Sequence, residues 1–466
     1  MNGPSRPTRE QRSASEANRG HLPRPTRGAE PAVANREALP AVATLGAAGF
    51  AIGLGLLLAI ALTVAAGAGA DWGPRWRALA QVHGQIMTLG WAGLFVVGMA
   101  ARLLPRFSGT PLRHPRLLYA AAVLIASGLI LRTLVQPFGE LPGGRALLVV
   151  GGLLFGLGAL CFAGSLLATL ARPLRERRPF AAFCAAGALW LPVASLLGVW
   201  TLARATTGAA FIVSGADEAP LLFAELYGFL LCFMLGVSLR SLPTLFAWKT
   251  PAWLAWLAFA ALQGGLLLSV GVRLAEAAGG ANLWALSAAG RLLFAGGLVA
   301  GAGCIGVWRP ASRMRDTAQA IALLLRAAYG WLLADAALIA YGAWRGLRLH
   351  AETPAAIDDA ARHVFALGVV STLIIGMAYL VGHMFAAERA QGAAMARRVR
   401  VYAWLLGAAV VLRAGGALLE ERGVLATRYW PMAAAGVLAL AALTLFAWRL
   451  LWGLRHSYLS ERARRP

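Results

Sequence analysis

Twelve apolar runs make up most of this chain, and each is long enough to cross a bilayer. About 20 helical residues span the hydrocarbon layer. A backbone in hydrocarbon must satisfy its own hydrogen bonds, which favours helices. We therefore predict an all-α polytopic membrane protein with twelve transmembrane helices, at residues 41–66, 79–104, 117–135, 146–170, 180–202, 221–245, 253–272, 283–307, 318–344, 363–385, 401–419 and 429–451.

Composition supports this class and excludes several others. The 466 residues are 59% hydrophobic and 14% charged, which is more apolar surface than a soluble core could bury. The net charge of +23 comes from arginines in short loops and at the ends, so we expect the lipid bilayer and no nucleic acid as partner. The four cysteines form no CxxC pair, which argues against covalent haem, iron–sulfur clusters and a disulfide framework.

The charge of the loops alternates along the chain. Arginine gathers in every second loop, and most acids lie in the others. The positive-inside rule then places both termini in the cytoplasm, and we expect a bacterial inner membrane. Residues 1–38 are predicted to be a disordered basic tail, residues 39–453 the membrane domain, and residues 454–466 a second basic tail.

A weak repeat links the second, sixth and tenth helices. Their segments begin GMAARLLPRF at Gly98, GVSLRSLPTLF at Gly236 and GMAYLVGHMF at Gly376. Counted from each glycine, Arg102 matches Arg240. Chance similarity among Gly/Leu/Arg-rich segments is the alternative. A true repeat would give three four-helix units about an axis normal to the membrane.

Two histidines, His83 and His363, lie at similar depth near the starts of the second and tenth runs. An imidazole in hydrocarbon is costly without a partner, so two at one depth suggest a shared ligand, with haem iron as the candidate. His383 is 20 residues from His363, about 30 Å along a helix, and belongs to a different layer as a separate metal-binding candidate. The alternative is that each histidine only bonds a carbonyl across a helix interface.

Intramembrane charges supply the other candidates. Arg291 and Arg413 could each pair with a haem propionate, whereas Arg132 is expected to extend to the membrane surface. Arg326 and Asp335, nine residues apart in the ninth run, each need a partner on another helix or in a polar cavity. They could serve a proton path or a structural pair.

Copper is supported by two thin sets of ligands. One set is His383 with Met377 and Met384, and the other is Glu225 with Cys232. Neither set has a decisive spacing.

Twelve helices with facing histidines on helices 2 and 10 resemble the catalytic subunit of haem–copper oxidases and nitric oxide reductases. In that superfamily helices 6 and 7 supply three copper-binding histidines, and helix 10 supplies a second histidine close to the first. This chain has none of these. The resemblance therefore implies an electron-transfer haem site without the oxygen-reducing binuclear centre.

The chain also resembles the NnrS family of haem- and copper-containing membrane proteins of the nitric oxide response. The segment from His83 to Met87, followed by Gly98, Arg102, Pro105 and Gly109, is similar to the HxHE segment of that family. Further similarity lies at residues 236–243, 324–333 and 362–383. Gln85 and Ile86 stand where the family has its second histidine and its glutamate.

We therefore expect a haem b protein of the inner membrane that acts in the nitric oxide response or in haem-linked electron transfer. Its partners would be nitric oxide and an electron-donor protein or quinone, and any turnover would be that of a haem-dependent oxidoreductase. Two alternatives remain. One is a proton-coupled secondary transporter that uses Arg326, Asp335 and Glu225, and the other is a non-catalytic subunit of a respiratory assembly.

Overall fold

The computed structural model describes residues 40, 42–279, 283–309, 316–380, 393–421 and 429–462. Within these residues twelve helices are long and apolar enough to cross a membrane, which confirms the predicted number and the all-α class. We number these spans 1–12 in chain order. His383 and the predicted tail at residues 1–38 lie outside the described residues.

Two kinds of span occur in the described part of the chain. Spans 3, 4, 5, 7, 8, 9, 11 and 12 are single α-helices: α6 (Pro115–Val135), α7 (Gly144–Arg175), α8 (Pro179–Arg204), α11 (Ala252–Ala277), α12 (Trp284–Ile305), α13 (Asp316–Leu349), α16 (Ala393–Glu421) and α17 (Tyr429–Arg462). Spans 1, 2, 6 and 10 each contain a π-helical segment: η1–α3 (Ala51–Leu56, Leu57–Gly67), α4–η2–α5 (Pro74–Gln85, Ile86–Gly93, Leu94–Ser108), α9–η3–α10 (Gly215–Phe223, Ala224–Leu231, Cys232–Leu245) and α14–η4–α15 (Ala355–His363, Val364–Ser371, Thr372–Leu380).

Local sequence explains several helix ends. Pro74, Pro115 and Pro179 each stand in the first turn of their helix, where the missing N–H has no intrahelical partner to lose. Gly109 and Gly306 follow α5 and α12 with φ of 65° and 69°. This left-handed conformation is favourable for glycine and ends the helix.

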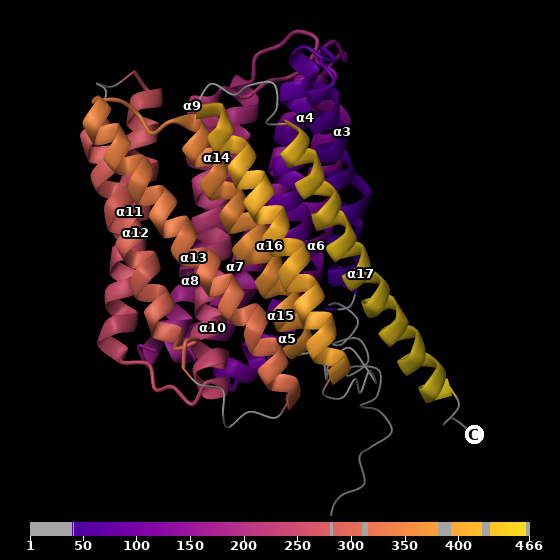
Figure 1. The fold of residues 1–466 in the computed structure, drawn as a ribbon, viewed down its shortest axis with the longest axis vertical. Helices are drawn as coiled ribbons and strands as arrows, with labels where there is room; N and C mark the ends of the chain where they lie inside the picture. Colours follow the sequence, from indigo (N-terminus) through magenta and orange to yellow (C-terminus); the bar gives the residue numbers. More distant parts are fainter. Residues whose placement is uncertain are drawn as a thin grey trace, which may run out of the picture. The chain divides into compact units, whose positions relative to one another are not determined.

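Spans 2, 6 and 10 form the centre of the bundle. Consecutive spans pack side by side, and α17 of span 12 returns to pack on α3 of span 1 (Figure 1). The three π segments η2, η3 and η4 contact one another. The membrane windows of spans 2, 6 and 10 are 83%, 83% and 72% buried, against 33–61% for the other nine described spans. The three repeated helices are therefore the core around which the others pack.

The predicted repeat is present in these central spans. Their π segments begin at Ile86, Ala224 and Val364, each twelve residues before the repeated glycines Gly98, Gly236 and Gly376. Eight residues before each repeated glycine is another glycine that contacts a large aromatic side chain of the preceding span: Gly90 with Phe50, Gly228 with Trp190, and Gly368 with Trp331. The same contact thus holds the first two helices of each four-helix unit together.

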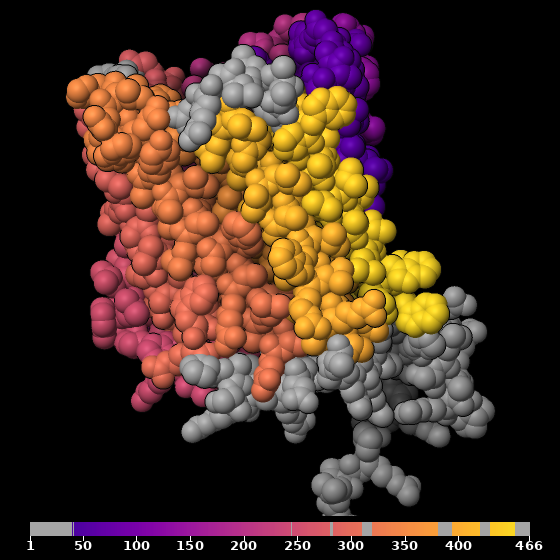
Figure 2. All heavy atoms as spheres, in the orientation of Figure 1, coloured from indigo at the N-terminus to yellow at the C-terminus, as the bar shows by residue number. Residues whose placement is uncertain are grey.

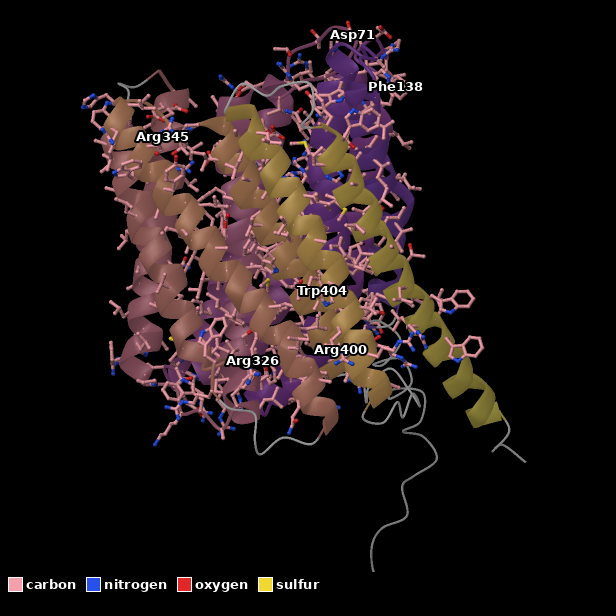
Figure 3. The ribbon with its side chains drawn as sticks, in the orientation of Figure 1. Asp71, Phe138, Arg326, Arg345, Arg400 and Trp404 are labelled. Carbon is pink, nitrogen blue, oxygen red and sulfur yellow. The ribbon has the colours of Figure 1, made fainter. Side chains whose placement is uncertain are left out.

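The two ends of the bundle differ in charge. One end, which we call the acidic end, carries the loop residues Asp71, Glu140 and Glu352, and the opposite, basic end carries Arg113 and Lys249 in its loops. Figure 3 labels Asp71 at the acidic end and Arg400 at the basic end. The described loops thus follow the charge alternation of the sequence.

The outer helices present apolar side chains outward. On α16 and α17, whose side chains cover much of the face seen in Figure 2, Trp404, Val411, Val437 and Trp448 are all more than half exposed. Soluble monomeric proteins rarely expose an apolar surface of this extent. The protein is accordingly a multi-pass membrane protein, and these residues face lipid.

Candidate functional site

His83 and His363 lie near one another, on two of the central spans. His83 is on α4 and His363 ends α14, and each stands just before a π segment. π-Helical segments are rare in proteins, and those that occur are often found at functional sites. The charges of the two imidazoles interact with each other and with those of Arg413 and Asp359. The structure therefore brings together three of the predicted residues and adds Asp359.

Backbone carbonyls fix both imidazole rings. The Nδ1–H of His83 donates to the carbonyl oxygen of Gly55 in η1 at 2.9 Å, and that of His363 donates to the carbonyl of Asp359 at 2.8 Å. Each ring is thus a tautomer with its Nε2 lone pair available. Both rings are only partly buried although they lie inside the bundle.

Asp359 links His363 to Arg413. Its Oδ1 lies 3.2 Å from His363 Nδ1, and its Oδ2 lies 2.8 Å from Arg413 Nη1 on α16 of span 11. This ion pair engages one nitrogen of the guanidinium, and within the described residues Arg413 has no other polar partner. A guanidinium with a spare donor beside two imidazoles is well suited to bind an anionic group.

Arg291 belongs to a different place. It forms a bidentate pair with Asp358, with distances of 2.5 and 2.8 Å, and its side chain is 7% exposed. Asp358 and Asp359 are neighbours on α14, so their side chains point to spans 8 and 11 respectively. Of the two predicted arginines, only Arg413 lies beside the histidines.

Arg132 does not extend to the membrane surface, and that expectation is wrong. Its side chain is 6% exposed, and its Nε donates to Gln136 Oε1 at 2.7 Å. Gln136 bonds Gln81, which holds the 205–214 loop through both backbone groups of Val213. The guanidinium faces Glu218 and Glu225 across this network. Polar partners inside the bundle therefore hold the Arg132 side chain, in place of water at the membrane surface.

Gln85 is tied to span 6. Its Nε2 donates to Glu225 Oε2 at 2.8 Å, and both residues are buried. Cys232 Sγ accepts a bond from Gln263 Nε2 at 3.1 Å and donates to the Tyr227 carbonyl. The described residues contain no group of three or more His, Cys, Asp or Glu side chains that could hold a metal ion. Glu225 and Cys232 each have an amide partner in the structure, Gln85 and Gln263.

Asp335 finds its partner on span 6 and not in Arg326. Tyr227 donates its hydroxyl to Asp335 Oδ1 at 3.0 Å. Arg326 instead donates to the carbonyls of Val307 and Arg309 at the basic end. The two residues that the sequence placed together in span 9 thus serve different parts of the bundle.

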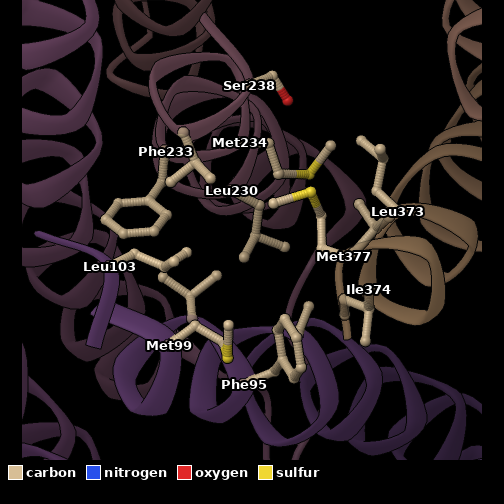
Figure 4. A pocket seen from close by; sticks show the side chains of 14 residues that line it. Phe95, Met99, Leu103, Leu230, Phe233, Met234, Ser238, Leu373, Ile374 and Met377 are labelled. Atoms are coloured by element: carbon tan, nitrogen blue, oxygen red, sulfur yellow. The ribbon is translucent and has the colours of Figure 1, made fainter. Parts of the chain in front are cut away.

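An apolar cavity lies where the central spans meet. It measures about 50 Å³ and is lined by side chains of spans 2, 6 and 10, with Ser238 its one hydroxyl (Figure 4). Met234 and Met377 extend toward one another across it in Figure 4. Because its walls are apolar, the cavity is dry.

Two residues of the histidine site were missed in the sequence. Gly55 offers only a carbonyl, which no side-chain pattern reveals. Asp359 lies before the predicted start of span 10 at His363, whereas α14 begins at Ala355. The i,i+4 spacing of Asp359 and His363 would have been the available signal.

Comparison with known proteins adds one finding. No protein-family model and no curated protein matches the chain. Among solved structures it is similar to a heme-copper terminal oxidase, determined as a dimer by cryo-electron microscopy, with a TM-score of 0.60 and 12% sequence identity over 90% of this chain and 84% of that chain. The fold is haem–copper oxidase-like. At this identity the likeness concerns the fold alone, in agreement with the architecture expected from the sequence.

Proposed function

We propose that His83 and His363 together would hold one haem b. The main support is that each imidazole donates its Nδ1–H to a backbone carbonyl, which leaves its Nε2 available for iron. His83 makes the bond across a helix interface that was the alternative, and His363 bonds a carbonyl of its own helix, but each bond occupies only one nitrogen of the ring. They therefore support metal binding as much as they support a structural role.

The surroundings of the histidines fit this cofactor. Arg413 has guanidinium N–H groups outside its ion pair with Asp359 that could bind a propionate, and the partly buried rings border space that protein atoms do not fill. Arg291, saturated by Asp358, would not be a propionate partner. Spans 6 and 7 carry no histidine, so the residues present do not fit the copper centre of an oxidase.

We further propose a role in the nitric oxide response, as the NnrS resemblance implies, with haem-linked electron transfer as its chemical basis. A haem held by these two residues would supply one-electron transfer. In this proposal the protein fixes the tautomers of His83 and His363 and keeps Arg413 beside them. The proposed location is the bacterial inner membrane.

An absorption spectrum of the purified protein tests the haem proposal. We expect a Soret band that is lost in His83→Ala and in His363→Ala and is partly restored by added imidazole. His114→Asn is the matched control, because His114 is exposed at the basic end and asparagine tolerates its φ of 51°. A colourless wild-type protein from haem-replete cells would disprove the proposal.

A proton-coupled transporter is the second candidate. It is favoured by the buried, singly bonded carboxyl of Asp335. Proton-coupled uptake into proteoliposomes by a protein without a chromophore would support this function over the first.

A further inference from the structure

Asp335 is a carboxyl without a cation. It is 0% exposed in the middle of α13, and only its Oδ1 is bonded, by Tyr227 at 3.0 Å. Its Oδ2 has no hydrogen-bond partner, and no arginine, lysine or histidine of the described residues forms an ion pair with it. Isolated carboxylates are very costly to bury, so this one is stable only as the neutral acid. It holds a proton.

The aromatic surroundings of Tyr227 keep the Asp335 carboxyl away from other charges. The Tyr227 ring packs on Phe223, Phe294 and Phe365, with centroid distances of 4.8, 5.1 and 4.7 Å. These rings come from spans 6, 8 and 10. The charged groups that face the site from neighbouring elements, Arg291 of span 8 and Asp358 of span 10, interact with Tyr227. Tyr227 is therefore the connection between Asp335 and the polar groups.

A small polar pocket lies on the acidic-end side of Tyr227. Its lining includes Tyr227, Ile339, Arg291, Asp358 and Arg362, and its volume is about 30 Å³. One water needs about 10–15 Å³ and two or more polar partners, so the pocket has room for about two waters. Ile339 is one helical turn from Asp335, which places the pocket next to the Tyr227–Asp335 pair.

The basic-end side of Asp335 is lined by apolar side chains. On the same face of α13 toward that end stand Leu332 and Ala328, which are 1% and 0% exposed. The cavity between spans 2, 6 and 10 beyond them is apolar and dry. Charged side chains that could hold water therefore line the acidic-end pocket and not the apolar cavity.

We propose that Asp335 is a proton-binding site that exchanges its proton with the acidic end of the bundle through Tyr227 and the pocket. In loading, the Tyr227 hydroxyl hydrogen passes to the Asp335 carboxylate while a hydronium ion in the pocket gives a proton to the Tyr227 oxygen. Release reverses both transfers. In each direction Tyr227 gains one proton and loses one, so its hydroxyl stays neutral. The proposal uses no haem and stands apart from the histidine site.

Infrared absorption of the full-length protein in lipid tests the proposal. We expect a carbonyl stretch of a protonated carboxyl that is absent in Asp335→Asn. In Tyr227→Phe the band should move to higher frequency, because the carboxyl loses its hydrogen-bond donor. Should Asp335→Asn fail to fold, an unchanged band in Tyr227→Phe overturns the proposal. Wild-type protein without any such band in the neutral pH range overturns it as well.

Exchange into D₂O tests the route. Ala219→Leu fills the polar pocket and should slow deuteration of the Asp335 band by at least about tenfold, because exchange then needs a local opening of the bundle. Ala92→Leu adds the same volume to the dry cavity and should leave the rate unchanged. The opposite result, with Ala92→Leu slow and Ala219→Leu normal, would mean that the proton comes from the basic end and would contradict the proposal.

Discussion

Asp358 and Asp359 show how adjacent side chains on one helix serve separate sites. Asp358 pairs with Arg291 of span 8, whereas Asp359 pairs with Arg413 of span 11 and lies against His363. Successive residues on a helix are about 100° apart, so neighbours in sequence face different helices. Only Asp359 belongs to the surroundings of the proposed haem.

Substitution of the two carboxylates should therefore have different effects. Asp359→Asn removes the ion pair with Arg413 and weakens the support of His363, and we expect haem affinity to fall about 10–100-fold. Asp358→Asn leaves Arg291 buried without its partner and should cost about 3 kcal/mol of stability with an unchanged spectrum. Haem titration and thermal unfolding measure the two quantities. Equal loss of haem in both variants would show that this division is wrong.

The π segments and the glycine contacts belong together at the level of the element. η2, η3 and η4 meet at the centre, and each central helix admits a large aromatic side chain of the preceding span at a glycine. A Cβ at Gly228 or Gly368 would lie 2.7 Å from the ring of Trp190 or Trp331. Such an overlap forces a shift of the indole ring or of the helix.

Alanine at these glycines should destabilise the bundle. Gly228→Ala is expected to cost about 1–3 kcal/mol through overpacking, seen as a lower melting temperature in detergent. Gly296→Ala is the matched control, because a Cβ there meets nothing within 4 Å and alanine should raise helix stability by about 0.5–1 kcal/mol. If both variants melt like the wild type, the glycine contact does not hold spans 5 and 6 together.

At the scale of the whole molecule, the haem–copper oxidase-like fold combines three four-helix units around spans 2, 6 and 10. Because one end of the bundle is acidic and the other is basic, the positive-inside rule predicts the orientation of the bundle in the membrane. The positive-inside rule predicts that the acidic end, and with it the water pocket beside Tyr227, lies outside the cytoplasm.

Cysteine labelling tests this orientation. Glu140→Cys at the acidic end should react with an impermeant thiol reagent in intact cells stripped of their outer envelope, and Lys249→Cys at the basic end should react only after permeabilisation. Both positions are exposed in the structure. The wild type is the control for its four intramembrane cysteines. Labelling of Lys249→Cys alone in intact cells would reverse the orientation.

Sequence alone determined the class of the protein, the number of spans and the three repeated helices. Hydrocarbon offers no hydrogen bonds, so length and hydropathy are enough to mark a membrane helix. The partners of polar residues were decided only by tertiary structure. Arg132 turned inward to Gln136, Asp335 met Tyr227 from 108 residues away, and His83 found a carbonyl in span 1. The physical reason is that packing sets the rotation and depth of each helix, and these decide which side chains meet.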